Sequence, residues 1–314
     1  MIVLELLDVV FITGFLEATI RIATPLVFAA IGETFVERSG VLNLGCEGMM
    51  LLGAIAGFIG AYWGNLWIGL ALALVAGASI ALLMAFMSVT LRINQIINGI
   101  VLWIFGLGLS TYIYRAVIPI KEPTPLLTGL QPIYIPFLSD IPILGKVLFQ
   151  QNALIYIALL LVIVSQVILF RTKVGLHIIA VGENPRAAET LGINVFQIRF
   201  ACLLFGGAMA GLGGAFLAVG VVKTFVENMV AARGFIAVAL VIFGKWRPLR
   251  VLGGALLFGG LEALQIRLLA LGLDVPYQFP AMLPYILTIV VLILVARKAE
   301  APASLCIPYK KGGD

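Results

Sequence analysis

NALIYIALLLVIVSQVILF, residues 152–170, contains no acidic or basic side chain. An α-helix needs roughly 20 mostly apolar residues to cross the hydrocarbon core of a bilayer. The whole chain has the same character, since 62% of its 314 residues are hydrophobic and only 11% are charged. A soluble domain has about 45–50% apolar and about 25% charged residues. Lipid must therefore cover much of this protein, and a single large soluble core is excluded.

Comparable apolar runs recur along the chain. They predict an all-α, polytopic membrane helix bundle in which residues 1–314 form one transmembrane domain. Nine spans are expected, and eight or ten remain open because two of the runs are imperfect. The nine expected spans are 9–31, 41–61, 66–90, 95–115, 152–170, 196–221, 228–244, 250–270 and 280–296.

Basic residues at the ends of these runs predict the orientation, because cytoplasmic connections carry an excess of Lys and Arg. One set of connections holds thirteen: Arg38, Arg92, Arg171, Lys173, Arg186, Arg199, Lys245, Arg247, Arg250, Arg297, Lys298, Lys310 and Lys311. The opposite set holds six: Arg115, Lys121, Lys146, Lys223, Arg233 and Arg267. The C-terminus is therefore expected in the cytoplasm and, with nine spans, the N-terminus outside.

Three further features exclude classes of function. The net charge of +5 comes from residues at the ends of apolar runs, so no nucleic-acid binding is expected. The cysteines at 46, 202 and 306 have no paired spacing, which argues against a disulfide framework or a metal cluster. Glu5 and Asp8 stand where a cleaved leader would carry basic residues, so no leader is expected.

The connection 116–151, expected outside, is rich in proline. Proline fixes the backbone angle φ and lacks an N–H, so a continuous helix is excluded and an extended, ordered cap is favoured. Its prolines are Pro119, Pro123, Pro125, Pro132, Pro136 and Pro142.

The connection 171–195, expected in the cytoplasm, reads RTKVGLHIIAVGENPRAAETLGINV. Asn184 as N-cap, Pro185 at the first helical position and Gly192 as the stop predict a short helix over PRAAETL. A helix of about two turns is marginal alone, so something is expected to pack on it. The segment is therefore predicted to be a docking site.

Polar side chains within the membrane require a structural or functional explanation, because a charge at the bilayer centre costs at least about 2.5–3.5 kcal/mol on insertion scales. Asn43 and Glu47 lie four residues apart on one helical face, beside Gly45 and Gly48. They predict either a pore-lining or gating helix start, or a Glu47 carboxylate that caps neighbouring backbone amides. Asn94 and Asn98 either bind a polar solute or tie helices together.

The expected span 228–244 is unusual because only GFIAVALVIFG, residues 234–244, is cleanly apolar. Such a segment is too short to cross alone and indicates a broken or re-entrant helix, which often marks a substrate route. The alternative is a simple span with Arg233 reaching the outer interface. Glu262 is the deepest polar residue of the next span and is expected to face protein. Arg233 and Glu262 therefore join the pathway and gating candidates.

The chain contains no GxxxxGK[ST] phosphate loop, so it is not expected to bind ATP by itself. It lacks the several mid-membrane carboxylates expected of an ion-coupled pump, and no set of side chains suggests an enzyme. A short helix that awaits a partner points instead to an ATPase on a separate chain.

Three segments together resemble the permease subunits of ABC importers for nucleosides and ribose-like sugars, in the superfamily that includes branched-chain amino acid permeases. They are PLVFAAIGETFVERSGVLNLGCEGMMLLGA (25–54), VGENPRAAETLGINV (181–195) and RGFIAVALVIFGKWRP (233–248). The resemblance spans about residues 15–297. It is greater to the nucleoside-type branch, which carries the ERSGVxNLGxEGMM stretch. An extra N-terminal span of the sugar branch is not expected here.

The resemblance implies a pore subunit of a nucleoside importer that works by alternating access in a bacterial plasma membrane. A second permease, expected to form a heterodimer, would complete the pore. Cytoplasmic subunits would bind ATP and Mg, and an extracytoplasmic binding protein would deliver the solute. No cofactor and no metal are expected on this chain. The ATPase would grip the coupling-helix position, which comprises Gly182, Asn184, Pro185, Arg186, Ala187, Ala188, Leu191 and Gly192.

Two other functions stay open. One is a permease for simple sugars such as ribose or galactose, and the other is an ion-coupled secondary transporter that works without partners. A channel is disfavoured because no filter motif is present. The sequence does not identify the solute, since the binding protein largely sets specificity in such systems.

Overall fold

A computed structural model describes residues 9–118, 125–270 and 300–311, together with the isolated positions 278, 282, 286, 290 and 293. The described chain is helical, and within it the β-type pairing is one isolated bridge between Pro132 and Asn152. The expected ninth span, 280–296, lies outside the described residues apart from four of the isolated positions.

Seven described helices are long and apolar enough to cross a membrane. They are α2 (Val9–Arg38), α3 (Cys46–Trp63), α4 (Leu66–Ala85) with its continuation η1 (Phe86–Thr90), α5 (Gln95–Val117), α7 (Ala153–Arg171), α10 (Val195–Ala215) with η2 (Phe216–Val222), and α12 (Pro248–Ala270). An eighth apolar helix, α11 (Arg233–Phe243), has 11 residues and is shorter than the span expected at 228–244. The predicted all-α, polytopic membrane bundle is confirmed.

Three shorter helices lie in the two long connections: α6 (Leu144–Leu148), α8 (Lys173–Glu183) and α9 (Pro185–Thr190). Helix α9 is the predicted short helix. Helix α8 was not predicted, because its two glycines lower the helix propensity of the segment. Its buried positions Ile178 and Val181 are three residues apart and lie on one face, so packing stabilises it.

Asparagine residues begin many of the helices. In each case the side-chain oxygen accepts a backbone N–H from the first turn, which otherwise has no partner in the helix. These N-caps are Asn65 for α4, Asn94 for α5, Asn152 for α7, Asn184 for α9 and Asn194 for α10.

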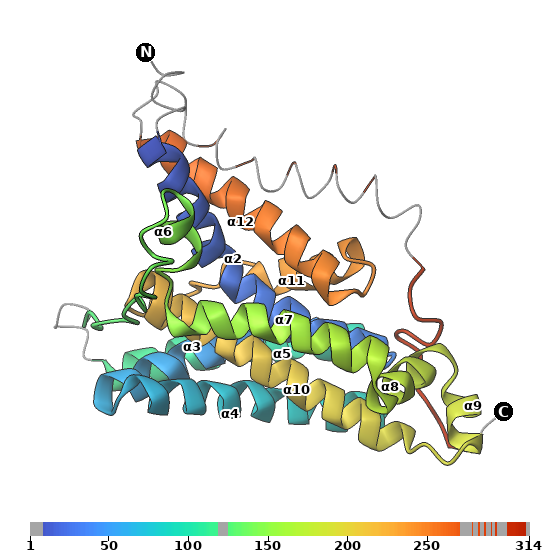
Figure 1. Ribbon diagram of the computed structural model, residues 1–314. Coiled ribbons are helices and arrows are strands. Elements are labelled where there is room, and N and C mark those ends of the chain that lie inside the picture. Colours follow the sequence, from blue (N-terminus) through green and yellow to red (C-terminus); the bar gives the residue numbers. More distant parts are fainter. Residues whose placement is uncertain are drawn as a thin grey trace.

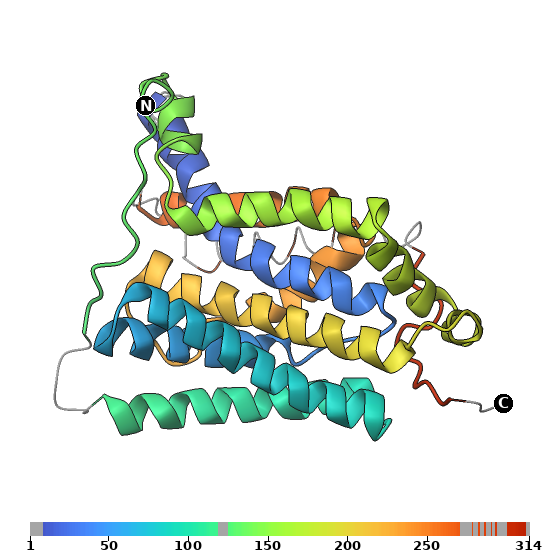
Figure 2. The same ribbon diagram turned by 60° about the horizontal axis from the view of Figure 1, so that its bottom comes forward.

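Helix α2 has 30 residues and continues through Pro25. A proline inside a helix removes one backbone hydrogen bond and bends the axis. Figures 1 and 2 show that the two parts of α2 run in different directions, the second of them within the bundle. The residues from Ile22 to Glu37 are buried without interruption, so this second part forms the centre of the fold.

Helices α3, α4 and α10 pack with their backbones in contact. A Cβ atom on Gly53 of α3 would overlap the backbone of Gly211 in α10. A Cβ atom on Gly77 of α4 would overlap the backbone of Gly207 in α10. Small residues allow this approach in lipid, where van der Waals contact drives helix association. Large apolar side chains on the outside, such as Trp67, remain exposed, as lipid-facing residues do.

The two long connections lie at opposite ends of the bundle (Figures 1 and 2). Residues 125–151 and α6 lie at one end, here termed the cap end. Helices α8 and α9 and the C-terminal residues lie at the other, here termed the α9 end. The described part of the proline-rich connection is mostly extended or turn, with α6 near its close.

Candidate functional site

Helices α3 and α11 begin inside the bundle rather than at one of its ends. Gly48, in the first turn of α3, packs on the backbone of Leu102. Leu102 lies seven residues into α5, which corresponds to a depth of about 10 Å along that helix. Gly234, in the first turn of α11, packs on the backbone of Glu47. The two helix starts therefore meet inside the protein.

Glu47 links these two helix starts. Its carboxylate accepts the backbone N–H of Ala232 at 2.8 Å and that of Gly234 at 2.6 Å. The first N–H groups of a helix lack partners and carry partial positive charge, so a carboxylate there is stabilising. Glu47 is 1% exposed. Its geometry is that of the capping alternative, but the capped amides belong to a helix 185 residues further along the chain.

Asn43 lies beside a second buried carboxylate, that of Glu33 in α2. Glu33 accepts the backbone N–H of Asn43 at 3.1 Å and its side-chain N–H at 3.2 Å. The side-chain oxygen of Asn43 accepts the backbone N–H of Gly45 at 3.1 Å. These contacts order residues 39–45, which lead into α3. Asn43 and Glu33 are both buried in protein.

Arg233 and Glu262, which the sequence analysis treated separately, form an ion pair between α11 and α12. Arg233 also donates to the backbone oxygens of Met229 at 3.3 Å and Val230 at 3.1 Å. The two charged side chains are 17% and 19% exposed. Arg233 therefore points into the bundle, and the pair joins the start of α11 to α12. The sequence feature that could have predicted this ion pair is the presence of one basic and one acidic residue in consecutive apolar segments.

Asn94 and Asn98 have different surroundings. Asn94 is an exposed N-cap that accepts the backbone N–H groups of Ile96 and Ile97. Asn98 is buried, and its amide donates to the Ser88 hydroxyl at 2.6 Å and to the Met84 carbonyl at 3.3 Å. Asn98 therefore ties α5 to α4 and η1, whereas the Asn94 side chain caps the start of α5.

A cavity of about 770 Å³ lies at the cap end. The start of α2, residues 139–143 and Lys146 of the cap, and Arg267 of α12 line it. Its charged side chains are Glu17, Asp140, Lys146 and Arg267. None of the pathway candidates from the sequence lines this cavity.

At the opposite end, α9 begins at the predicted residue, Pro185, and ends at Thr190, one residue before the predicted end. The Asn184 side chain accepts the backbone N–H of Ala187 at 3.0 Å, and Pro185 occupies the first helical position. Gly192 has φ of +81°, a left-handed backbone conformation that favours glycine and ends the helix. The local chemistry of these residues thus forms a helix of only six residues.

The predicted coupling residues divide into an exposed and a buried group. The exposed group contains Arg186, Ala187 and Leu191, and the Leu191 side chain is 80% exposed. The buried group contains Gly182 and Ala188. Ala188 packs with Val181, Val195 and Tyr309, which fastens α9 to the bundle. Gly182 approaches the carbonyl of Arg38 so closely that a Cβ atom would overlap it.

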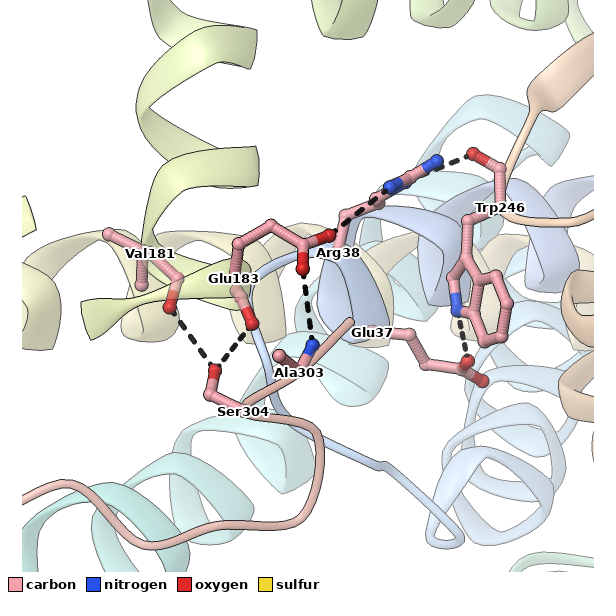
Figure 3. A network of polar contacts seen from close by, with 8 residues as sticks. Glu37, Arg38, Val181, Glu183, Trp246, Ala303 and Ser304 are labelled. Carbon is pink, nitrogen blue, oxygen red and sulfur yellow. Dashed lines mark hydrogen bonds and ion pairs between the residues drawn. The ribbon is translucent and has the colours of Figure 1, made fainter. Parts of the chain in front are cut away.

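A polar network joins the end of α8 to the ends of α2 and α11 (Figure 3). Arg38 lies between the Trp246 carbonyl, 3.3 Å from its Nε, and the Glu183 carboxylate at 4.0 Å. The indole N–H of Trp246 donates to Glu37 at 2.6 Å. These contacts could not be predicted from the sequence, because Glu37 and Trp246 lie more than 200 residues apart along the chain. The ends of three helices are thus held together immediately before α9.

The amino-acid sequence matches a known protein family. Residues 15–296 match the family described as the permease component of branched-chain amino acid transport systems. No solved structure matches the chain.

Three relatives have similar sequences over most of their length. The chain is 42% identical to the proposed glucose ABC transporter permease TsgC13 of Haloferax volcanii, over 86% of this chain and 82% of the relative. It is 38% identical to the guanosine ABC transporter permease NupQ of Bacillus subtilis, over 94% and 96%. It is 35% identical to the nucleoside ABC transporter permease NupC of Lactococcus lactis, over 92% and 94%.

Apart from the first six residues of α2, the described membrane-spanning helices, the paired helix starts and the short helix at the α9 end lie within the matched residues. The expected resemblance to ABC importer permeases is thereby confirmed. The chain belongs to the family of ABC transporter permeases of the branched-chain amino acid type.

Proposed function

We propose that this chain is the pore-forming subunit of an ATP-driven nucleoside importer whose ATP is hydrolysed on a separate subunit docked on α9. The proposal rests on the length of α9 and on which of its side chains are buried or exposed. It is a six-residue helix with a buried anchor at Ala188 and an exposed apolar side chain at Leu191. Such a helix presents a small surface to a partner while its other side moves with the bundle.

Nucleosides are the favoured solutes because two relatives that cover nearly the whole chain are named for guanosine and nucleoside transport. The polar groups inside the bundle agree with a path for an uncharged solute. The carboxylates of Glu33 and Glu47 are occupied by amide donors, and Arg233 is paired with Glu262. The described charges at the paired helix starts thus have counter-charges or amide donors within the protein, which supports an uncharged solute.

The proposal includes partners on both sides of a bacterial plasma membrane. The α9 end faces the cytoplasm, where basic residues accumulate, and it contacts subunits that bind ATP and Mg. The cap end faces outward, toward a solute-binding protein. A second permease subunit, sister to this chain, completes the pore. The full sequence has no phosphate-binding loop, which supports an ATPase on another chain.

The deciding experiment places a charge on the exposed face of α9. Ala187→Glu should abolish capture of the ATPase subunit by the tagged, detergent-solubilised permease and reduce guanosine uptake to background. Ala187 is exposed, so the amount of permease in the membrane should not change. Ala187→Ser, which keeps a small side chain at the same position, should behave like the wild type. If Ala187→Glu retains both capture and uptake, α9 is not the docking element.

A sugar is the second candidate solute, because the 42% identical relative is a proposed glucose permease. Competition separates the two candidates: excess unlabelled guanosine should block uptake of labelled guanosine, whereas excess glucose or ribose should not. An ion-coupled transporter would lose uptake when a protonophore collapses the gradient at constant ATP. The proposed importer should instead lose uptake only when ATP is depleted.

A further inference from the structure

The C-terminal residues 300–311, here termed the C-terminal strap, lie against the elements that surround α9. In Figure 3, Ala303 and Ser304 of the strap lie beside Val181 and Glu183 of α8. The contacts of the strap connect three parts of the molecule that are far apart in sequence.

The strap completes the end of α8. The last carbonyl groups of a helix have no partners within the helix. The Ser304 hydroxyl reaches the carbonyl of Gly182 at 2.6 Å and that of Val181 at 3.2 Å, and the Ser304 N–H donates to Gly182 at 2.9 Å. The Ala303 N–H donates to the Glu183 carboxylate at 3.3 Å. The strap therefore fixes the residues that directly precede α9.

The strap also contacts α9 itself. The Tyr309 hydroxyl bonds the Glu189 carboxylate on α9, and the Tyr309 ring packs with Phe196 of α10 at 5.7 Å between ring centroids. Burial and the neighbouring Glu189 carboxylate raise the pKa of Tyr309 to about 12. The hydroxyl is protonated at neutral pH and donates to the carboxylate, which can only accept. Lys311 lies 4.0 Å from the same carboxylate.

Arg199 of α10 joins the strap to the segment that leads into α3. Its guanidinium donates to the Ser39 carbonyl at 3.1 Å, the Ile307 carbonyl at 3.2 Å and the Ser304 hydroxyl at 3.3 Å. Arg199 is 1% exposed, and no carboxylate of the described residues forms an ion pair with it. A buried charge is stable only when its hydrogen bonds are satisfied. Both Ser39 and the strap must therefore stay in place around Arg199.

We propose that the C-terminal strap transmits displacement of α9 to the paired helix starts, with Arg199 as the positioning residue that holds it to Ser39. The path runs from Glu189 through Tyr309 and the strap to Arg199 and Ser39. From Ser39 the segment 39–45 leads to α3, whose Glu47 caps α11. This inference rests on the proposed function, because it takes α9 as the point where the ATPase acts.

The test measures guanosine uptake per ATP hydrolysed, with permease, ATPase and binding protein reconstituted in liposomes. Tyr309→Phe removes one hydroxyl and keeps the ring, and Ser304→Ala removes the hydroxyl shared by Arg199 and α8. Tyr309→Phe should lower uptake per ATP about fivefold, as expected for one lost hydrogen bond, and Ser304→Ala at least as much, because its hydroxyl contacts both α8 and Arg199. Capture of the ATPase subunit should stay at the wild-type level in both variants. Matched controls on exposed positions of α5 and α4, Tyr112→Phe and Ser79→Ala, should change the ratio less than about twofold.

A double-variant cycle tests the path itself. Glu189→Ala combined with Tyr309→Phe should lower uptake per ATP no more than Glu189→Ala alone, because both changes remove the hydrogen bond between Tyr309 and Glu189. Additive losses would show that the contact is not part of the path. Two other results overturn the proposal: an unchanged ratio, or an uptake loss that only follows a lower amount of assembled complex. Failure of the proposed function would appear separately, as wild-type permease that neither captures the ATPase nor imports guanosine.

Discussion

Helices α9 and α11 are both short, yet their first turns are capped in different ways. The cap of α9 is its own Asn184, three residues before the amide that it binds. The cap of α11 is Glu47, which reaches it from another helix. A local cap stabilises the first turn of a helix without any contact to the rest of the fold. The start of α11, in contrast, is stabilised only when the tertiary structure brings Glu47 to it. Helix α11 is therefore an integral part of the fold, whereas α9 is a locally stabilised helix on its surface.

This comparison separates residues that determine folding from residues that determine docking. The starts of α3 and α11 hold buried charges whose partners come from other helices. The exposed side of α9 holds an arginine and an alanine, and an exposed leucine follows at the end of the helix. Substitutions in the first region should therefore change stability, and those in the second should change transport. Three predictions test this difference, from the largest expected change in stability to the smallest.

Glu47→Ala should have the largest effect. It leaves the buried N–H groups of Ala232 and Gly234 without an acceptor, at a cost of about 4 kcal/mol for the two. Glu47→Gln retains one acceptor oxygen and should be affected about half as much. Thermal unfolding of the detergent-solubilised permease measures both variants.

The control for Glu47 is Glu227, whose carboxylate pairs with Arg115 at 2.7 Å on an exposed surface. Exposed ion pairs contribute about 0–1 kcal/mol, so Glu227→Ala should leave the unfolding temperature nearly unchanged. Equal losses of stability in Glu47→Ala and Glu227→Ala would contradict the capping role of Glu47.

Glu262→Ala should have the next largest effect, because it leaves the Arg233 guanidinium without its counter-charge in the bundle. Complete burial of an unpaired charge costs about 3–5 kcal/mol, and the partial exposure of this pair reduces the expected cost to about 2 kcal/mol. The double variant Arg233→Met with Glu262→Met should regain most of the lost unfolding temperature. If the double variant is less stable than either single variant, the ion pair does not hold α11 to α12.

Asn184→Ala should have the smallest effect on stability, about 1 kcal/mol, since it removes one N-cap. The loss is local to α9, a helix of six residues that is marginal without its cap. Capture of the ATPase subunit should therefore fall severalfold although the permease unfolds at nearly the same temperature. Asn65→Ala removes the equivalent cap from α4, a long helix, and should leave capture unchanged. Equal capture by the two variants would argue against α9 as the docking element.

The sequence predicted those parts of the structure that depend on neighbouring residues. Apolar runs located the seven long helices, and Asn184, Pro185 and Gly192 located α9. For the segment 228–244 the sequence left a broken helix and a simple span open, and the structure has the 11-residue helix α11 there. In each case the deciding interaction lies within one helix or one turn.

Contacts between distant residues were not predictable in the same way. The sequence identified Glu47, Arg233 and Glu262 as charged residues whose position within the membrane requires stabilising partners. Spacing along the chain cannot identify those partners. The capping residue of α11 lies 187 residues before Gly234. Arg199 was counted only as a basic residue at the end of a span, although it is buried between α2 and the C-terminal strap. Only the three-dimensional structure brings these residues together.

The backbone contact among α3, α4 and α10 has a consequence for amide hydrogen exchange. Where Gly53 meets Gly211 and Gly77 meets Gly207, no side chain separates the helix backbones, so water reaches these amides only if the helices part. Exchange there should be the slowest in the molecule and should remain slow during ATP turnover. These three helices are therefore expected to move together as one rigid unit.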